Sequence, residues 1–151
     1  MDKLCDNSPK ARKALEKYNK RLDEKKKQGI NVLEVDLENM DPGVRLHGIW
    51  ARHPLTGKQI PVYVASYVLA DYGNGIVMGV PFHDERDQAF ALENDLDMIC
   101  VVNEESQTMV NSTEDLNGVT VEKAAEKVVE LLGENGKFTT EYRLRDWLVS
   151  R

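Results

Sequence analysis

The sequence has few cysteines, no long apolar run and no overall excess of positive charge, and each shortage excludes a class of protein. Its 151 residues include only Cys5 and Cys100, too few for a disulfide framework and not spaced as a metal-binding pair, which suits a reducing compartment. No apolar stretch approaches the roughly 20 residues of a membrane-spanning helix. A net charge of −6 argues against a uniformly basic, nucleic-acid-binding surface. The start of the chain has the pattern of neither a signal peptide nor a transit peptide.

What the chain does contain is typical of one globular domain, since 41% of its residues are hydrophobic and 30% are charged. Ser8 and Pro9 predict the start of an amphipathic helix over residues 9–27. Residues 10–27 hold nine basic and three acidic side chains, a local excess of six positive charges. This face could steer a tRNA backbone. A solvated lysine-rich face is the simpler interpretation, because no aromatic residues or arginine cluster accompany it.

Elsewhere the apolar pattern predicts further strands and one more helix. Strands are expected over residues 30–35, 44–52 and 59–64, and a turn at 53–57 joins the last two into a hairpin. His47 and His53 have no metal-ligating partner at a recognisable spacing, so we expect both to be structural. A helix is expected to begin at Thr120 and Val121 and to end at Gly133, and its inward face is expected to consist of Ala124, Ala125, Val128, Val129 and Leu132.

The chain is organised around residues 71–87, where a glycine turn leads into an apolar run and then into a charged helix start. Gly73, Asn74 and Gly75 tolerate positive φ angles. The run at 76–80 is bounded by turn signals, which predicts a strand buried on both faces. A second apolar strand is expected over 98–102, so the strand, helix and strand would form a right-handed crossover unit.

Two carboxylates stand at this helix start. Asp84 is placed to cap a helix that runs to about residue 94, and Asp87 lies in its first turn. The simpler interpretation, which spacing alone favours, is that both side chains satisfy free amides and complement the helix dipole. The functional interpretation is that they present negative charge to a ligand at the carboxyl end of a strand.

Three segments resemble the editing domain of leucyl-tRNA synthetase, in that family's order. The segment 72–87, YGNGIVMGVPFHDERD, is similar to its tyrosine-glycine-threonine-glycine, methionine, valine-proline and histidine-aspartate-x-arginine-aspartate block. Upstream, HPLTGKQIPV at 53–62 resembles the histidine-proline-leucine-threonine-glycine segment that precedes this block. Downstream, YRLRDWLVSR at 142–151 resembles the return to the catalytic domain in the bacterial and organellar type.

The resemblance implies a function and a role for each matching residue. It implies hydrolysis of the ester of mischarged tRNA-Leu, with the tRNA 3′ end as partner, water as nucleophile, and no metal or cofactor. Asp87 would bind the α-ammonium group of the misattached amino acid, assisted by Asp84 as the second catalytic carboxylate. The residues expected to bind substrate are Tyr72, Met78, His83 and Arg86, with Tyr72 and Met78 shaping the pocket and the adenosine site.

The resemblance also implies a fold and a division of the chain. We expect mixed α and β structure, with a barrel-like β-sheet core and flanking helices. Residues 1–140 would form a partial editing domain without its N-terminal part, and residues 141–151 would begin the return segment. ATP would be handled by the ligase domain of the parent synthetase. The rest of that synthetase is an expected partner, in the cytoplasm or mitochondrion, and no membrane partner is expected.

Three departures from the family pattern leave a second hypothesis open. The family's threonine-rich peptide has no counterpart in this sequence. Asn74 stands where the family has a threonine. Phe82 stands where the family has a small residue, and an inward-pointing ring there would obstruct the pocket. The alternative is therefore a non-catalytic tRNA-binding or structural fragment.

Overall fold

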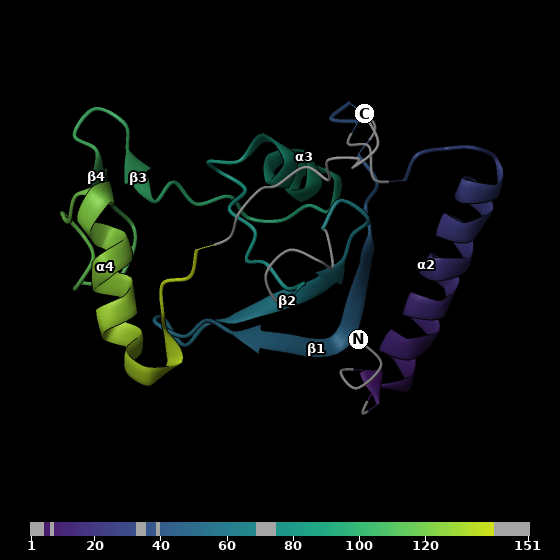
Figure 1. Ribbon diagram of the computed structural model, residues 1–151, viewed down its shortest axis with the longest axis horizontal. Helices are drawn as coiled ribbons and strands as arrows, with labels where there is room; N and C mark the ends of the chain where they lie inside the picture. Colours follow the sequence, from purple (N-terminus) through teal and green to yellow (C-terminus); the bar gives the residue numbers. More distant parts are fainter. Residues whose placement is uncertain (1–4, 7, 33–35, 39, 69–74, 141–151) are drawn as a thin grey trace, which may run out of the picture.

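The described part of the chain consists of helices and two small antiparallel sheets (Figure 1). The computed structural model describes residues 5–6, 8–32, 36–38, 40–68 and 75–140, so Tyr72, Asn74 and the expected return segment at 141–151 lie outside it. In chain order the elements are α2 (Pro9–Lys27), β1 (Val44–Arg52), β2 (Gln59–Val64), α3 (Glu85–Glu93), β3 (Val102–Asn103), β4 (Thr108–Met109), α4 (Val121–Leu132) and the short 3₁₀ turn η1 (Gly133–Asn135). The expected mixed α and β class is confirmed.

Helix α2 begins where the sequence predicts, because Ser8 caps it. The Ser8 hydroxyl oxygen accepts a hydrogen bond from the amide of Ala11 at 3.3 Å and donates one to the carbonyl of His47 at 2.8 Å. Pro9 follows as the first helical residue, where its missing amide hydrogen costs nothing. One side chain therefore both starts the helix and ties it to β1.

Helix α2 ends in a Schellman motif. Gly29 has a φ of +78°, its amide donates to the carbonyl of Lys26, and the amide of Ile30 donates to the carbonyl of Lys25. Residues 30–32 complete this turn and form no strand, so the strand expected over 30–35 is wrong for that part. Its remaining residues, 33–35, lie outside the described chain.

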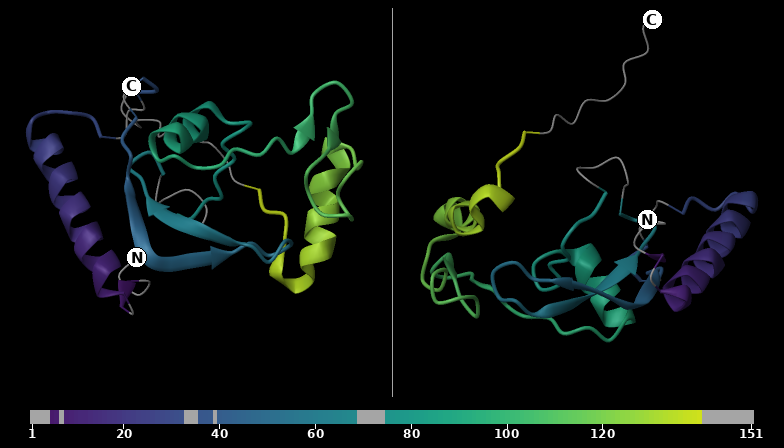
Figure 2. Two further views of the ribbon diagram at one scale, coloured as in Figure 1. Left: turned by 180° about the vertical axis from the view of Figure 1, so that it is seen from behind. Right: turned by 90° about the horizontal axis from the view of Figure 1, so that it is seen from below.

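The main core lies between α2 and the β1–β2 hairpin. Ala11, Leu15 and Tyr18 are buried on one face of α2, which fits the amphipathic helix predicted over residues 9–27. Ala11 and Leu15 form a core cluster with Leu46 of β1 and Cys5, which are both only 1% exposed. Figures 1 and 2 show α2 along one side of the hairpin and α4 at the opposite end of the molecule, with α3 between them.

The hairpin has the strand limits that the sequence predicts. β1 and β2 pair antiparallel, from Arg52 opposite Gln59 at the turn to Val44 opposite Val64 at the open end. The register shifts in the middle of β1, where Gly48 has a φ of +84°. This irregularity lets the strand bend along α2 and still keep its partner.

His53 organises the turn between the two strands. Its Nδ1 accepts hydrogen bonds from the amides of Leu55 at 3.3 Å and Thr56 at 3.2 Å. A tight turn leaves these two amides without a backbone acceptor, and the His53 side chain supplies one. The structural role expected of His53 is confirmed.

The buried strand expected over residues 76–80 is wrong. These residues form no strand and are exposed, with Ile76 at 75% and Met78 at 54%. The amide of Val80 bonds to a side chain, Asp87 Oδ2, and takes no part in a ladder. An apolar run forms a buried strand only where a neighbouring strand pairs with it. No described residue pairs with residues 76–80.

The second strand of the expected crossover is also largely absent. Of residues 98–102 only Val102 is in a strand, the two-residue β3 that pairs with β4. Val101 donates its amide to His83 Nε2 at 3.2 Å, and Ile99 is 53% exposed. The right-handed crossover unit is therefore wrong, because neither flanking segment belongs to a sheet around α3.

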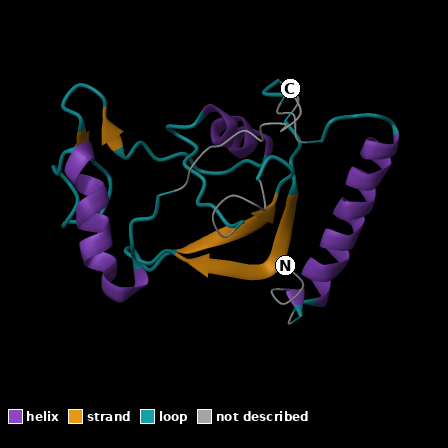
Figure 3. Cartoon of the chain, viewed as in Figure 1, coloured by secondary structure: helices purple, strands orange, loops and turns teal. Residues whose placement is uncertain are grey.

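The sheets are too small to enclose a barrel in the part of the chain that is described. They are two separate two-stranded ladders, β1–β2 and β3–β4 (Figure 3). Helix α4 has the predicted limits, with Thr120 before it and Gly133 after it. Its inward face is narrower than expected, since Ala124 is buried and Ala125 is exposed. No helix among the described residues is long and apolar enough to cross a membrane.

Asp41 holds the far end of α2 against the chain that enters β1. Its carboxylate lies 2.9 Å from the side chains of both Arg21 and Lys25, and it accepts the amide of Gly43 at 2.9 Å. Partial burial alone would raise the pKa of Asp41, but the hydrogen bonds from Lys25 and Gly43 and the charge of Arg21 outweigh burial and lower it.

We expect Asp41→Asn to lower the free energy of unfolding at pH 7 by about 1 kcal/mol, because it removes both ion pairs. The amide oxygen of asparagine can still accept the hydrogen bond from the Gly43 amide. The Asp41 carboxyl has a lower pKa in the folded chain than in the unfolded chain. Its stabilising contribution is therefore complete above the unfolded pKa of about 3.9 and is lost as the pH falls through the folded pKa. Urea unfolding from pH 7 to acid should show the two proteins converging. A pH-independent difference would contradict this. The control is Asp115→Asn, because Asp115 is exposed and the described chain records no ion pair for it.

Candidate active site

Asp84 is the N-cap of α3. Its Oδ1 accepts the amides of Arg86 at 3.0 Å and Asp87 at 3.1 Å, and its backbone is extended, with φ −127° and ψ 123°. The simpler of the two interpretations is thus confirmed for this carboxylate. The second oxygen, Oδ2, lies 3.8 Å from the guanidinium of Arg86, a contact between two exposed groups that contributes little.

Asp87 is not a cap, although it lies one turn into the same helix. Its Oδ1 accepts the hydroxyl of Tyr67 at 2.9 Å, and its Oδ2 accepts the amide of Val80 at 2.7 Å. The side chain points back from α3 toward two other segments, the chain that follows β2 and the apolar run at 76–80. The structure therefore separates the two acids that spacing alone treats as a pair.

Tyr67 is the site residue that the sequence pattern does not reveal. Burial, the hydrogen bond to Asp87 and the negative charge of Asp87 together raise its pKa, so the phenol stays protonated and donates. Its ring lies 5.7 Å from that of Phe90, which also meets Tyr63 edge-on at 5.3 Å. Nothing local in the sequence marks Tyr67, because its role depends on a residue 20 positions further along the chain.

The other expected site residues lie around the same helix start but do not converge on Asp87. His83 Nε2 accepts the amide of Val101, and its ring meets that of Phe82 at 5.1 Å. Arg86 is exposed and turns toward Asp84. Phe82 is 43% exposed, and its recorded ring contact is with His83, whereas Asp87 bonds to Tyr67 and Val80.

An exposed apolar surface adjoins the Asp87 carboxylate. A Cβ placed on Gly79 would lie 3.8 Å from Asp87 Oδ2, so this part of the chain passes close to the acid. The exposed apolar side chains in this part of the chain are Ile76, Val77, Met78, Val80 and Phe82. Such a surface suits a ligand that carries an ammonium group beside an apolar group, as an amino acid does.

A separate cavity lies on the other side of Tyr67. It has a volume of about 670 Å³ and is lined by Lys25, Asp41, Ser66 and Tyr67, among others. Neither Asp84 nor Asp87 lines it, so among the described residues Tyr67 is what the cavity and the carboxylate site share. No group of three or more metal-ligating side chains occurs among the described residues.

The chain matches proteins of one family along most of its length. A family model described as the editing domain of leucyl-tRNA synthetase matches residues 1–133. The chain is 46% identical over 117 residues to a leucine–tRNA ligase of Caldanaerobacter subterraneus, covering 69% of the chain. It is 41% identical over 157 aligned residues to one of Clostridium perfringens, covering 95% of the chain. The chain therefore belongs to the leucyl-tRNA synthetase editing-domain family.

These relatives are much longer than the chain. The matched part is 14% of the Caldanaerobacter protein, 18% of the Clostridium protein and 15% of a leucine–tRNA ligase from Mycoplasmoides gallisepticum, which is 42% identical over 124 residues and matches 75% of this chain. The family match includes the whole of α3 and both carboxylates.

The cap role of Asp84 leads to a stability prediction. Asp84→Ala leaves the first amides of α3 without a partner, so we expect the free energy of unfolding to fall by about 1 kcal/mol. Glu85→Ala, in the same turn but exposed and without a side-chain hydrogen bond among those recorded, is the matched control. Urea unfolding at pH 7 checks both, and equal losses in the two variants would contradict the cap.

Proposed function

We propose that the chain performs aminoacyl-tRNA editing as part of a leucine–tRNA ligase, by hydrolysing the ester that joins a wrong amino acid to the 3′ end of tRNA-Leu. The observation that carries the proposal is the anchored Asp87 carboxylate beside exposed apolar side chains, in a chain of this family. The site of action would be the cytoplasm or mitochondrion, where such a tRNA is charged.

In this proposal Asp87 binds the α-ammonium group of the misattached amino acid. Each of its oxygens already accepts one hydrogen bond, and an ionised carboxylate has about four acceptor positions, so roughly two remain. An ammonium group fills them with charge-assisted bonds. The two protein donors fix the direction of the carboxylate and prevent it from turning away when the ligand is absent.

The other residues act around this contact. Asp84 fixes the start of α3 and so positions Asp87. Met78, which is exposed, would offer a polarisable surface to the amino acid side chain. Tyr72, His83 and Arg86 are assigned to the adenosine and the remaining substrate contacts. Water is the nucleophile, and the substrate's own hydroxyl group and backbone donors support its attack without a metal or cofactor.

Editing is needed because binding alone discriminates weakly between similar apolar side chains. Aminoacyl-tRNA synthetases are the standard example: one methylene group changes binding by only about 1–3 kcal/mol. A second site that recognises the ammonium group and admits the wrong side chain removes the errors. ATP would be used only in the ligase domain of the parent enzyme, which is a further partner in this proposal.

The exposed run at 76–80 supports a finer view of the fold. It is apolar and exposed, and it lacks a strand partner among the described residues. We propose that it joins a larger, barrel-like sheet with other parts of the synthetase. This pairing would cover its apolar side chains and satisfy its backbone groups.

Asp87→Asn tests the ammonium contact cleanly. The new amide keeps both anchors, since its oxygen accepts from Val80 and its nitrogen donates to the Tyr67 oxygen. What is lost is the negative charge and the acceptor position of one oxygen, both of which the ammonium group would use. We expect binding of an adenosine that carries norvaline through a stable amide link to weaken about 10- to 100-fold, from the loss of about 1.5–3 kcal/mol for a hydrogen bond to a charged group. Calorimetry measures the dissociation constant.

The control ligand is the same adenosine with a pentanoyl group, which lacks the ammonium group. The variant should bind it as well as the original chain does. Glu85→Gln, which removes one charge from the exposed face of the same helix turn, should leave both ligands unaffected. Equal weakening of the two ligands by Asp87→Asn would refute the ammonium contact. The rate of deacylation of norvalyl-tRNA-Leu should likewise fall in Asp87→Asn and stay unchanged in Glu85→Gln.

A further inference from the structure

The outer face of α2 carries lysines for which the described part of the chain records no ion pair. Three of the nine basic side chains in residues 10–27 are held by acids elsewhere, Arg12 by Asp6 and both Arg21 and Lys25 by Asp41. Within the described chain no ion pair is recorded for the remaining six. These are Lys10, Lys13, Lys17, Lys20, Lys26 and Lys27.

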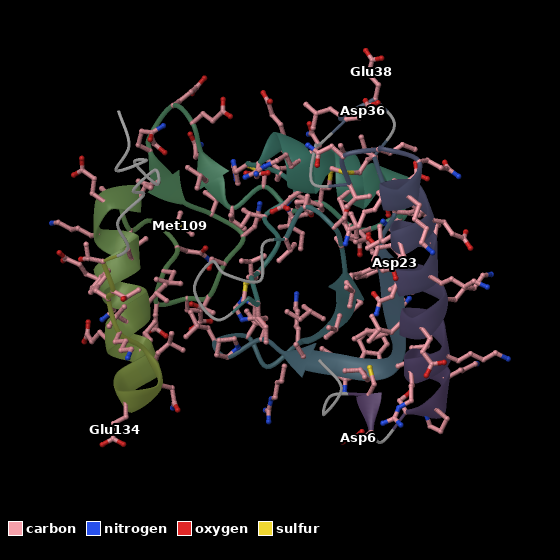
Figure 4. The ribbon with its side chains drawn as sticks, turned by 45° about the vertical axis from the view of Figure 1, so that its right-hand side comes forward. Asp6, Asp23, Asp36, Glu38, Met109 and Glu134 are labelled. Atoms are coloured by element: carbon pink, nitrogen blue, oxygen red, sulfur yellow. The ribbon has the colours of Figure 1, made fainter. Side chains whose placement is uncertain are left out.

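Five of these lysines form one stripe. At about 100° per residue, Lys13, Lys17 and Lys20 project within a narrow sector opposite the buried residues Ala11, Leu15 and Tyr18. Lys10 and Lys27 extend the stripe at its two ends, over about 26 Å of helix. We call these five residues the lysine stripe. Figure 4 shows side chains of α2 projecting away from the rest of the molecule.

The net negative charge of the whole chain does not cancel the positive potential of the lysine stripe. At physiological salt, charges more than about 8 Å apart are largely screened. Glu24 lies within the stripe and Glu16 and Asp23 lie along one edge, so five positive charges face three negative ones at close range. The net charge of −6 resides mainly on other surfaces, which would repel a polyanion from them.

We propose that the lysine stripe is a docking surface for the phosphate backbone of a nucleic acid duplex. Lysine ammonium groups on flexible stems bind phosphates without demanding one geometry. A duplex presents a phosphate about every 3.4 Å along each strand, so the stripe spans several phosphates. The outer face of α2 has no aromatic side chain, because Tyr18 points inward, and it therefore offers no stacking platform for single-stranded bases.

A membrane surface fits this face less well. A helix that lies on a bilayer buries its apolar side in the lipid, with lysines flanking it. The apolar side of α2 is already buried against β1, so only charge would remain to hold the lipid. The same surface is also separate from the Asp87 site, and its test measures binding and not hydrolysis.

The test compares two variants of the full chain that lose the same charge in different places. The first is Lys13→Gln with Lys17→Gln and Lys20→Gln; the second is Lys58→Gln with Lys123→Gln and Lys137→Gln, all exposed and outside the stripe. Glutamine keeps good helix propensity. The probe is a labelled RNA hairpin, with a DNA hairpin beside it, and fluorescence anisotropy gives the dissociation constant over a range of salt concentrations.

We expect the stripe variant to bind the RNA hairpin at least tenfold more weakly at about 0.1 M salt, with the salt slope reduced by about 2 to 3, since each phosphate contact contributes about 0.9. The second variant should bind within about twofold of the original chain. Circular dichroism and melting should be unchanged in both. Comparable binding of the DNA hairpin fits backbone recognition, and preference for RNA fits recognition of its A-form shape.

Three results would overturn the proposal. The first is equal weakening in the two variants, which would make net charge the cause. The second is the absence of hairpin binding by the original chain even at low salt. The third is binding to anionic phospholipid vesicles that is as tight as hairpin binding and equally sensitive to the stripe variant.

Discussion

The carboxylate of Asp87 is the contact on which the arrangement around α3 depends. It accepts one hydrogen bond from Tyr67, after β2, and another from the amide of Val80, at the end of the exposed apolar run. Among the described residues no ladder links these two segments, so the contacts recorded between them and α3 are this side chain, the ring contacts of Phe90 with Tyr63 and Tyr67, and the amides of His83 and Asp84 that donate to the Val80 carbonyl. A charged side chain thus links segments that backbone ladders join in most mixed folds. Its oxygens can still accept hydrogen bonds from further donors.

The structural features that depend on neighbouring residues could be predicted from the sequence. The limits of α2, the β1–β2 hairpin, the cap at Asp84 and the end of α4 follow from residues that lie within a few positions of each other. Ser8, Asp84 and Gly133 each act on backbone groups of their own turn, so no knowledge of distant partners is needed. The candidate acids at α3 were identified in the same way.

What the sequence did not reveal depends on distant partners. The runs at 76–80 and 98–102 have the composition of strands, but a strand exists only where another segment supplies its hydrogen bonds. The link from Asp87 to Tyr67 spans 20 positions, and Tyr67 has no marked spacing. The different roles of Asp84 and Asp87 likewise depend on where each side chain turns, which spacing on one helix does not determine.

The two proposed surfaces address a common electrostatic problem. A site whose main group is a carboxylate attracts an ammonium group but repels the phosphates of the nucleic acid that would deliver it. The lysine stripe lies on α2 while Asp87 lies on α3, and this separates attraction for the backbone from recognition of the amino acid. Screening over about 8 Å keeps the two fields largely independent. The acidic remainder of the surface then limits the orientations in which a nucleic acid approaches, so the charge pattern serves placement as well as affinity.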